Sequence, residues 1–336
     1  MIECIFTIDY EIYGNGEGSL QELVYEPAEK LKAVFRRWNA PCVVFVEAAE
    51  LEIIGFERAD KSIFLVERQV REFHEDGFEI GLHLHPQWYN ARYEDAQWQL
   101  DYREYNLCRL SSCRIDQIID RSIAFLRKVL EAPNYTPLSF RAGNWLLQPA
   151  KAVTKSLSEH GIKIDSSVFK GGLQHQHNLD YRRSCKNGYY WAFSEDVNVP
   201  DPRGNLLEIP TFTKMVPMWK MFAAKRIRLQ QKGPAKIRLQ QGRLGRLRDF
   251  MRFSHPMKLD FCRLTAAQII QMFDGELKKD RRAPAIFRPI VAIGHTKDLV
   301  NLETLESFLS YLRSNGVPIS TFRDMHDNIT RRDGQS

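Results

Sequence analysis

The sequence predicts an α/β fold, and within that class a barrel of strands and helices is favoured over an open doubly wound sheet. Short apolar runs rich in β-branched residues alternate along the chain with helical patterns, and this alternation implies parallel strands joined by crossover helices. Seven or eight such strands in 336 residues fit one barrel. The ionisable residues also gather at predicted strand ends, which is where barrels of this type place their chemistry.

The predicted strands are short, mostly apolar segments. Such runs are typical of strands buried in a parallel sheet. They span residues 3–9, 41–47, 78–83, 138–142, 163–168, 206–211, 287–294 and 318–323.

The predicted helices are marked by apolar residues at three-to-four spacing and by their end signals. Pro27 suits the first turn of the first helix, and Gly161 and Gly316 fall where two helices end. The helices span residues 27–38, 66–75, 115–130, 150–160, 266–277 and 302–314.

Composition favours an intracellular globular protein. The chain is 43% hydrophobic and 27% charged, which is enough apolar material for a sizeable core. No run approaches the ~18–20 uncharged apolar residues of a membrane span. The N-terminus has no basic segment before its apolar run, so we expect no secretory signal and a cytoplasmic location. The six cysteines form no C-x-x-C pair and are expected to be buried, reduced thiols.

Positive charge is concentrated in one stretch. Residues 214–253 hold twelve Lys and Arg and one acid, Asp249, for a net charge of +11, whereas the rest of the chain carries −5. Within it, Ile-Arg-Leu-Gln-Gln occurs at 227–231 and again at 237–241. We interpret residues 214–258 as a basic, mostly helical insertion.

Three roles are open for this insertion: a solvated basic loop, a nucleic-acid contact and a membrane contact. The acidic barrel beside it would repel a long polyanion, which disfavours nucleic acid. Bulky apolar residues at 215–222 precede the densest charge, and this combination suits the surface of an anionic bilayer. The sequence therefore predicts peripheral contact with the inner face of the cytoplasmic membrane.

Two carboxylates end the first predicted strand. Asp9 and Glu11 are two residues apart, so on an extended chain their side chains point to the same face. One interpretation is a solvated strand end. The chemical one is that one carboxylate holds a cation while the other stays ionised as a base.

Two histidines end the third predicted strand. His83 and His85 also project to one side if the strand continues. Two imidazoles and one carboxylate form the ligand set of a catalytic zinc-type site, with positions left for water and substrate. The alternative is one packed and one exposed histidine.

Three further strand ends carry ionisable residues. Arg141 precedes an Ala-Gly-Asn turn, in which the backbone N–H near Asn144 would suit an oxyanion. A tight turn beside a salt-bridged arginine is the simpler interpretation. Asp165 lies in the fifth strand and His295 closes a late one. If Asp165 is within reach, it could hold His295 protonated as a general acid.

Five segments in a fixed order carry a family resemblance. They are Thr-Ile-Asp-Tyr-Glu (7–11), Glu-Ile-Gly-Leu-His (79–83), Phe-Arg-Ala-Gly (140–143), Asp-Ser-Ser-Val (165–168) and Ile-Gly-His (293–295). In this combination the chain resembles the polysaccharide deacetylases, carbohydrate esterase family four, from residue 3 to about 325. The resemblance implies an irregular (β/α)₇ barrel, taken here as one domain over 1–330 with a tail at 331–336. It also implies one divalent metal ion, usually zinc, that helps remove acyl groups from N-acylated sugars.

The resemblance assigns catalytic roles by position. Asp9 resembles the base that activates the metal-bound water, and Arg141 the residue that orients this base. His295 resembles the acid that protonates the leaving amine, and Asp165 its partner. The backbone N–H near Asn144 would help to hold the oxyanion.

The implied metal ligands are Glu11, His83 and His85, and they depart from the family pattern. The family usually has adjacent aspartates and the spacing H-x-x-x-H. Here the second acid comes one residue later as Glu11, and Gln87 stands at the fourth position after His83. His85 is the nearest substitute, and Gln87 is the alternative. The segment His-Leu-His-Pro-Gln-Trp resembles a subgroup associated with bacterial surface-polysaccharide and O-antigen synthesis.

The predicted function is a metal-dependent hydrolase that removes an N-acetyl or N-formyl group from an amino sugar of a cell-surface glycan. Trp88, Asn144 and Trp145 follow two of the segments and are candidate sugar contacts; rim packing is the equal alternative for the tryptophans. The rival functions are an amidase on a small cyclic amide and a non-catalytic barrel that binds glycan or scaffolds synthesis enzymes. The sequence leaves open the sugar, the oligomeric state and whether the substrate is nucleotide-linked, lipid-linked or polymeric.

Overall fold

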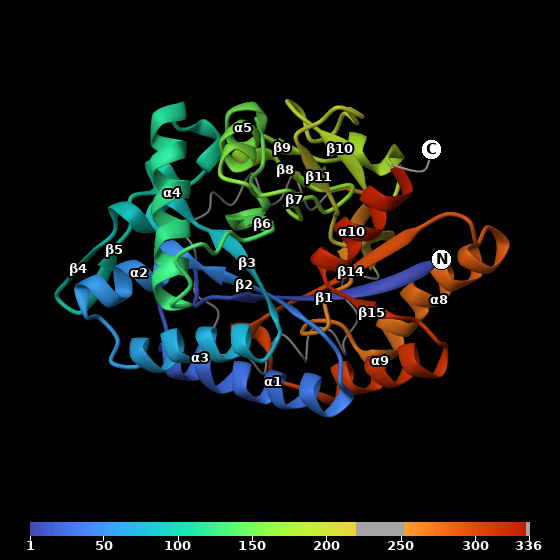
Figure 1. The fold of residues 1–336 in the computed structure, drawn as a ribbon, viewed down its shortest axis with the longest axis horizontal. Coiled ribbons are helices and arrows are strands. Elements are labelled where there is room, and N and C mark those ends of the chain that lie inside the picture. The colour runs from blue at the N-terminus through green and yellow to red at the C-terminus, as the bar shows by residue number, and fades with distance from the viewer. Residues whose placement is uncertain (220–251, 334–336) are drawn as a thin grey trace.

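The computed structural model describes residues 1–219 and 252–333. Its centre is a sheet that curls into a barrel, with helices packed around the outside (Figure 1). In the described residues, seven strands follow one another in parallel in the order β11, β7, β6, β3, β2, β1, β14. These strands are β1 (Ile2–Tyr10), β2 (Val43–Glu47), β3 (Glu79–Leu84), β6 (Ser139–Ala142), β7 (Ile164–Asp165), β11 (Leu206–Glu208) and β14 (Arg288–His295).

The two ends of the curled sheet meet at a parallel bridge. Thr211, just after β11, pairs with Val291 of β14, and the Phe212 N–H donates to the Val291 carbonyl oxygen at 3.0 Å. Two further strands join the sheet: β10 (Trp191–Phe193) runs antiparallel to β11 at one end, and β15 (Ile319–Ser320) pairs in parallel with the start of β1. The predicted α/β barrel is confirmed.

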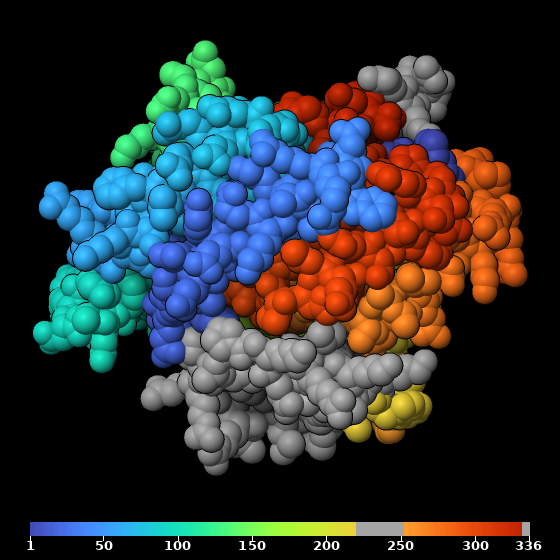
Figure 2. All heavy atoms as spheres, turned by 90° about the horizontal axis from the view of Figure 1, so that it is seen from below, coloured from blue at the N-terminus to red at the C-terminus, as the bar shows by residue number. Residues whose placement is uncertain are grey.

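Helices cover the outside of this barrel. In Figure 1, α1, α3 and α9 lie below the sheet, and α4 and α5 lie above it. Figure 2 shows α1 and α9 next to each other on the lower face, where Arg37 pairs with Glu306. No described helix has the length and apolar character needed to cross a membrane. The helices are α1 (Glu26–Trp38), α2 (Ala48–Glu57), α3 (Ile63–Glu75), α4 (Ser112–Val129), α5 (Lys151–Glu159), α8 (Ala266–Arg282), α9 (Glu303–Ser314) and α10 (Phe322–Asp333).

Two of these helices were not predicted. Helix α2 is buried around most of its surface, so it shows no amphipathic stripe. Helix α10 begins inside the segment 318–323, which was predicted as a strand; only β15 is extended there, so the second half of that prediction is wrong. Thr321 and Asp324 exchange hydrogen bonds at the start of α10, and this cap is the signal that could have placed the helix. Residues 331–333 belong to α10 rather than to a tail.

Alternate residues of β1 face opposite layers. Phe6 and Ile8 pack toward the surrounding helices, whereas Ile5 packs into the barrel interior with Val43 and Val291. Helix α10 adds Phe322 and two neighbouring residues to this interior cluster. Ile5, Thr7, Asp9 and Glu11 point to the same side of the extended chain. Apolar residues such as Ile5 fill the barrel near the start of β1, and Asp9 and Glu11 therefore lie at the other end of the barrel.

The basic insertion leaves and rejoins the barrel through a two-stranded antiparallel ribbon. Strand β12 (Thr213–Pro217) pairs with β13 (Ser254–Lys258), with Thr213 opposite Lys258. The predicted helices and the repeat between them fall within residues 220–251, which lie outside the described residues. Two other hairpins are formed by β4 (Arg92–Glu94) with β5 (Gln97–Gln99) and by β8 (Leu173–Gln174) with β9 (Leu179–Asp180).

Candidate active site

The polar residues at the ends of β6, β3, β1 and β14 meet at one edge of the barrel. Asp9 of β1 is level with His295 of β14, and His83 of β3 is level with Arg141 of β6. Parallel strands carry their C-terminal ends to the same edge, so side chains far apart in the sequence become neighbours. Asp9, Glu11, His83 and Arg141 are all almost completely buried.

Glu11 faces the two histidines predicted to bind metal. Its Oε2 lies 3.5 Å from His83 Nε2 and 3.2 Å from His85 Nε2, and potential ligand atoms of these three residues lie within 4.8 Å of one another. Glu11 Oε2 is buried and has no hydrogen-bond partner. A carboxylate oxygen left unsatisfied between two imidazole nitrogens fits a metal ion, which would use all three atoms as ligands.

The hydrogen bond on the far side of His83 supports this assignment. His83 Nδ1 lies 2.9 Å from the carbonyl oxygen of Arg141. That oxygen can only accept, so Nδ1 carries a proton, and Nε2 is the ring nitrogen that faces Glu11. A second partner that fixes the ring in this way is typical of metal-binding histidines.

His85 lies beside Glu11, and Gln87 lies behind His85. On the far side of its ring, His85 Nδ1 is 3.3 Å from Gln87 Nε2 and 3.1 Å from Asn144 Nδ2. Metal binding at His85 Nε2 needs an acceptor for Nδ1–H, and either amide supplies one after a half-turn that exchanges its oxygen and nitrogen. The oxygen of Gln87 is buried and unpaired. The geometry thus places His85, rather than Gln87, beside Glu11 and His83 as the candidate third ligand.

Lys297 completes the surroundings of Glu11. Its Nζ donates to Glu11 Oε1 at 2.7 Å. Burial alone would raise the pKa of Glu11, but the charge of Lys297 and the neighbouring imidazoles of His83 and His85 hold it well below its ordinary value. Glu11 is therefore ionised, as a metal ligand must be. The sequence analysis did not single out Lys297, two residues after His295.

Asp9 stands between a guanidinium and an imidazole. Arg141 Nη1 donates to Asp9 Oδ1 at 2.5 Å, and His295 Nε2 lies 3.4 Å from Asp9 Oδ2. Burial alone would raise the pKa of Asp9, but Arg141 and the imidazoles of His83 and His295 hold it below its ordinary value. The arrangement leaves an ionised carboxylate with an imidazole 3.4 Å away, which suits a general base.

The carboxylates near His295 are not the expected ones. Among the described residues, Asp9 and Asp298 lie within 4 Å of its ring, the latter at 3.8 Å from Nδ1. The prediction that Asp165 pairs with His295 is wrong. Burial lowers the pKa of His295 even though both neighbouring acids raise it, so the ring is neutral near pH 7 and is not held protonated.

Asp165 instead supports Arg141 through the turn that follows β7. It accepts hydrogen bonds from the backbone and hydroxyl of Ser167 at 3.0 and 2.6 Å. The neighbouring Ser166 accepts from Arg141 through its carbonyl oxygen at 3.1 Å and its hydroxyl at 3.2 Å. Glu208 lies close to Asp165, and burial raises the pKa of both carboxyl groups.

A strained turn carries the predicted substrate contacts over His85. A Cβ on Gly143 would lie 2.7 Å from the His85 ring, so only glycine lets the chain pass. Asn144 and Trp145 then adopt φ values of 54° and 67°, a left-handed conformation that side chains rarely accept. Strain of this kind is often found at binding sites.

The two tryptophans have different surroundings. Trp145 is partly buried with its ring 5.6 Å from that of Phe169, so part of it stays available. Trp88 is 0% exposed and packs under Trp98 at 5.0 Å. The prediction of Trp88 as a sugar contact is wrong because a fully buried ring has no face for a ligand.

Lys258 is a residue of this site that the sequence analysis missed. Its Nζ lies 4.0 Å from the ring centre of Trp145 and 4.8 Å from that of Phe169. Burial and the charge of Arg263 lower its pKa to about 7. Lys258 ends β13, so only the return of the insertion to the barrel places it here. No local pattern distinguishes it from the other basic residues of that stretch.

The comparisons with known proteins agree on the fold. No protein-family model matches the sequence, and no curated protein matches it. Among solved structures, the chain is similar to a protein assigned as a polysaccharide deacetylase from Mycobacterium smegmatis, with 15% identity, a TM-score of 0.56, and coverage of 99% of this chain and 91% of that one.

Two further solved structures resemble it. One is assigned as a polysaccharide deacetylase from Pseudomonas aeruginosa PAO1, with 12% identity, a TM-score of 0.53, and coverage of 98% and 91%. The other is the PuuE allantoinase, with 12% identity, a TM-score of 0.50, and coverage of 96% and 88%. Together with the curled barrel and the Glu11, His83 and His85 cluster at its edge, these likenesses show that the chain has the fold of the polysaccharide deacetylases.

Proposed function

We propose that this protein is a metal-dependent hydrolase that removes an N-acetyl or N-formyl group from an amino sugar of a bacterial surface polysaccharide or of its precursor. The observation that carries the proposal is Glu11 Oε2, which is buried and unpaired between two histidine nitrogens. An ionised Asp9 stands at the same strand edge with its own imidazole partner. A protein that only binds a glycan would need neither a metal site around Glu11 nor a general base at Asp9.

Glu11, His83 and His85 would hold the metal, which we take to be zinc because two imidazoles and a carboxylate suit that ion. When bound, the metal would lower the pKa of a water molecule and polarise the acyl carbonyl. Asp9 accepts the proton of the attacking water, and Arg141 holds the carboxylate in position. His295 is neutral and 3.4 Å from Asp9, so it can take up that proton and deliver it to the leaving amine. The backbone N–H near Asn144 is the expected oxyanion donor.

The direct test is release of acetate or formate by the purified protein. The metal content is measured first, and the protein is then incubated with N-acetylated and N-formylated amino sugars, free and nucleotide-linked. We expect one divalent ion per chain, activity that disappears with a chelator, and recovery on adding zinc. A protein that neither retains nor responds to a divalent ion would instead support the non-catalytic barrel.

A cyclic-amide hydrolase is the second candidate, and the likeness to an allantoinase favours it. Both reactions break a C–N bond next to a carbonyl group, so the same residues would serve. Small cyclic amides belong in the same assay. Turnover of a cyclic amide without release of acetate or formate from any sugar would favour this candidate.

We also propose that the protein works in the cytoplasm and contacts the inner face of the membrane through its basic insertion. Exposed apolar residues flank the base of the insertion: Met215 is 41% exposed, Trp219 70% and Phe253 95%. Apolar groups beside concentrated positive charge suit an anionic bilayer, where each basic residue contributes about 1 kcal/mol.

Liposome co-sedimentation tests this contact. Binding should require anionic lipid, weaken with salt and disappear when residues 223–246 are deleted, while activity on a small soluble substrate survives. Equal binding by the deletion variant, or no binding by the intact protein at low salt, would contradict it.

A further inference from the structure

Two fully buried glutamates lie next to the candidate metal ligands, and none of the chemistry described above uses them. Glu47 is the last residue of β2, and Glu50 lies in the first turn of α2. Both are 0% exposed. Strand β2 lies between β1, which leads to Glu11, and β3, which leads to His85. Side chains from the end of β2 can therefore reach both segments that carry ligands.

Each of the two carboxyl groups accepts a backbone hydrogen bond from one of those segments. The His85 N–H donates to Glu47 Oε1 at 2.5 Å. The N–H of Ile12, the residue after Glu11, donates to Glu50 Oε1 at 2.8 Å. Glu47 also caps α2, because its Oε2 accepts from the Glu50 N–H, and this cap ties the two glutamates to each other.

These hydrogen bonds take over where the sheet ends. Strand β1 ends at Tyr10 and β3 at Leu84, so neither Ile12 nor His85 belongs to a strand. Both residues are buried all the same, and a buried backbone N–H needs an acceptor. The two glutamates supply that acceptor at the points where the chain leaves the sheet.

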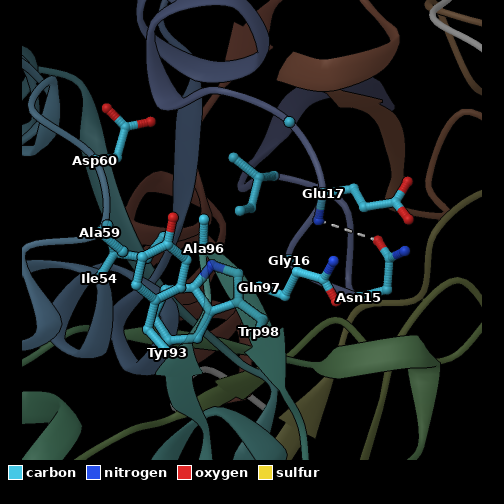
Figure 3. A pocket seen from close by; sticks show the side chains of 12 residues that line it. Asn15, Gly16, Glu17, Ile54, Ala59, Asp60, Tyr93, Ala96, Gln97 and Trp98 are labelled. Carbon is cyan, nitrogen blue, oxygen red and sulfur yellow. Dashed lines mark hydrogen bonds between the residues drawn. The ribbon is translucent and has the colours of Figure 1, made fainter.

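Packing constrains one side of Ile12 only weakly. A cavity of about 520 Å³, formed by the loop of residues 14–18, the end of α2 and the β4–β5 hairpin, is lined by Ile12 (Figure 3). An empty volume offers no atoms to pack against. The backbone of Ile12 is instead held by polar contacts, since its N–H donates to Glu50 and its carbonyl oxygen accepts from Lys297 Nζ at 2.9 Å.

The two glutamates are not explained by stability alone. In the described part of the chain they form no ion pair, and Glu50 Oε2 has no hydrogen-bond partner. Burying carboxyl groups without a charged partner is unfavourable. A serine or an asparagine would also cap α2, but its side chain is shorter than that of Glu47. The cost of burial points to a role that needs the longer side chain.

We propose that Glu47 and Glu50 are positioning residues for the metal site, which hold the two backbone segments so that Glu11 and His85 converge on one ion. This inference rests on the proposed function, because it assumes that these ligands bind a divalent metal. The ligands come from different strands, and a functional site needs them held to within ~0.5 Å. Two hydrogen bonds to one fixed corner of the molecule provide that constraint.

Zinc affinity, measured by competition with a chromogenic chelator, tests the proposal without relying on turnover. Glu50→Ala removes the acceptor of the Ile12 N–H and should weaken zinc binding about 10- to 100-fold, as the loss of groups that orient metal ligands typically does. Glu50→Gln keeps an acceptor oxygen, and Glu50 uses only one of its two, so this variant should bind zinc nearly as tightly as wild type. The visible absorption of the Co²⁺-loaded protein, which reports ligand geometry, should change in Glu50→Ala and not in Glu50→Gln.

Glu79→Ala is the matched control. Glu79 is also buried and accepts a backbone hydrogen bond, from Arg323 at 2.8 Å, but it stands at the start of β3, at the other end of the strand from the ligands. This variant should lower the melting temperature and leave zinc affinity and the Co²⁺ spectrum unchanged. A purely structural role of Glu50 would give the same result as this control.

Glu47→Gln is a second variant, so the test does not depend on the folding of Glu50→Ala. Its single acceptor oxygen cannot serve both the His85 and the Glu50 N–H groups, and zinc binding should weaken about 10-fold.

Zinc affinity equal to wild type in Glu50→Ala and Glu47→Gln would overturn the proposal. An equal loss in Glu50→Gln and Glu50→Ala would also overturn it, because the charge of Glu50, and not its hydrogen bond, would then determine the affinity. These outcomes leave the proposed function intact, whereas a wild-type protein that binds no divalent ion would contradict the proposed function and this inference together.

Discussion

Asp9, near the end of β1, and Glu11, just after that strand, are two residues apart, but their neighbours give them different chemistry. Asp9 is paired with Arg141, at 2.5 Å, and faces one imidazole, His295. Glu11 is paired with Lys297, at 2.7 Å, and faces two imidazoles whose nitrogens converge on its unpaired oxygen. The first arrangement suits proton transfer, and the second suits a cation.

The difference shows that ionisation alone does not define a role. A basic partner holds both pKa values below their ordinary level in spite of burial. What separates the two acids is the second oxygen of each: Asp9 Oδ2 lies beside one imidazole, whereas Glu11 Oε2 lies between the ring nitrogens of two. Substitutions around Asp9 and substitutions around Glu11 should therefore have separable effects on turnover and on metal binding.

The largest expected effect is loss of the metal ion from the site around Glu11. His83→Ala should abolish metal retention because a site with two histidines and one carboxylate has no spare ligand. Metal analysis after dialysis measures it, with His326→Ala, a histidine on α10 away from the site, as control. Retained metal and unchanged activity in His83→Ala would remove the metal assignment.

Asp9→Asn should reduce turnover without affecting metal binding. The change is nearly isosteric and removes the base, so turnover should fall at least ~10²-fold while the metal content stays the same. Steady-state kinetics together with metal analysis decide it. Loss of the metal in this variant would mean that the two carboxylates do not divide the work as described, and full activity would place the base elsewhere.

The pH profile should reflect the neutral state of His295. The sequence analysis expected a protonated ring, hence activity that falls at alkaline pH. Burial instead lowers the pKa of His295 below its ordinary 6.5, so kcat/KM should rise as pH rises through that region and then hold level. His295→Ala should lose about 10²-fold in rate. An alkaline fall that disappears in His295→Ala would restore the protonated ring as the acid.

The smallest expected effect is on the pH dependence of stability, and it comes from the lysines near the two acids. Lys297 is paired with Glu11 and its pKa is raised, whereas Lys258, stacked on Trp145, has a pKa of about 7. Above pH 7 the unfolded state binds a proton at Lys258 that the folded state has lost, so the free energy of unfolding should increase with pH up to about 10. One such group adds at most ~1.4 kcal/mol per pH unit, and partial exposure makes the slope smaller.

Denaturant unfolding between pH 7 and 9.5 measures this slope. Lys258→Met should flatten it, and Lys61→Met, in the exposed turn before α3, should leave it as in wild type. Equal slopes in all three proteins would show that Lys258 keeps its ordinary charge in the folded state.

Much of the fold could be read from local patterns. The alternation of buried strands with amphipathic helices predicted the barrel, because the periods of two and of 3.6 residues report which face of an element is buried. Helix α2 was missed because it is buried nearly all round and shows no contrast between two faces. Helix α10 was missed because it begins inside the segment 318–323, which was predicted as a strand.

The sequence by itself determined which residues stand at the strand ends: Asp9 and Glu11, His83 and His85, Arg141, and His295. Strand direction and the period of two are local properties, and they suffice to send these side chains to one edge. Tertiary structure alone decided the partners. In the folded chain, His295 lies beside Asp9 and Asp298 rather than Asp165. Trp88 is buried beneath Trp98, and the β12–β13 ribbon brings Lys258 against Trp145. Distances across a barrel depend on how every strand and loop packs, and no short stretch of sequence contains that information.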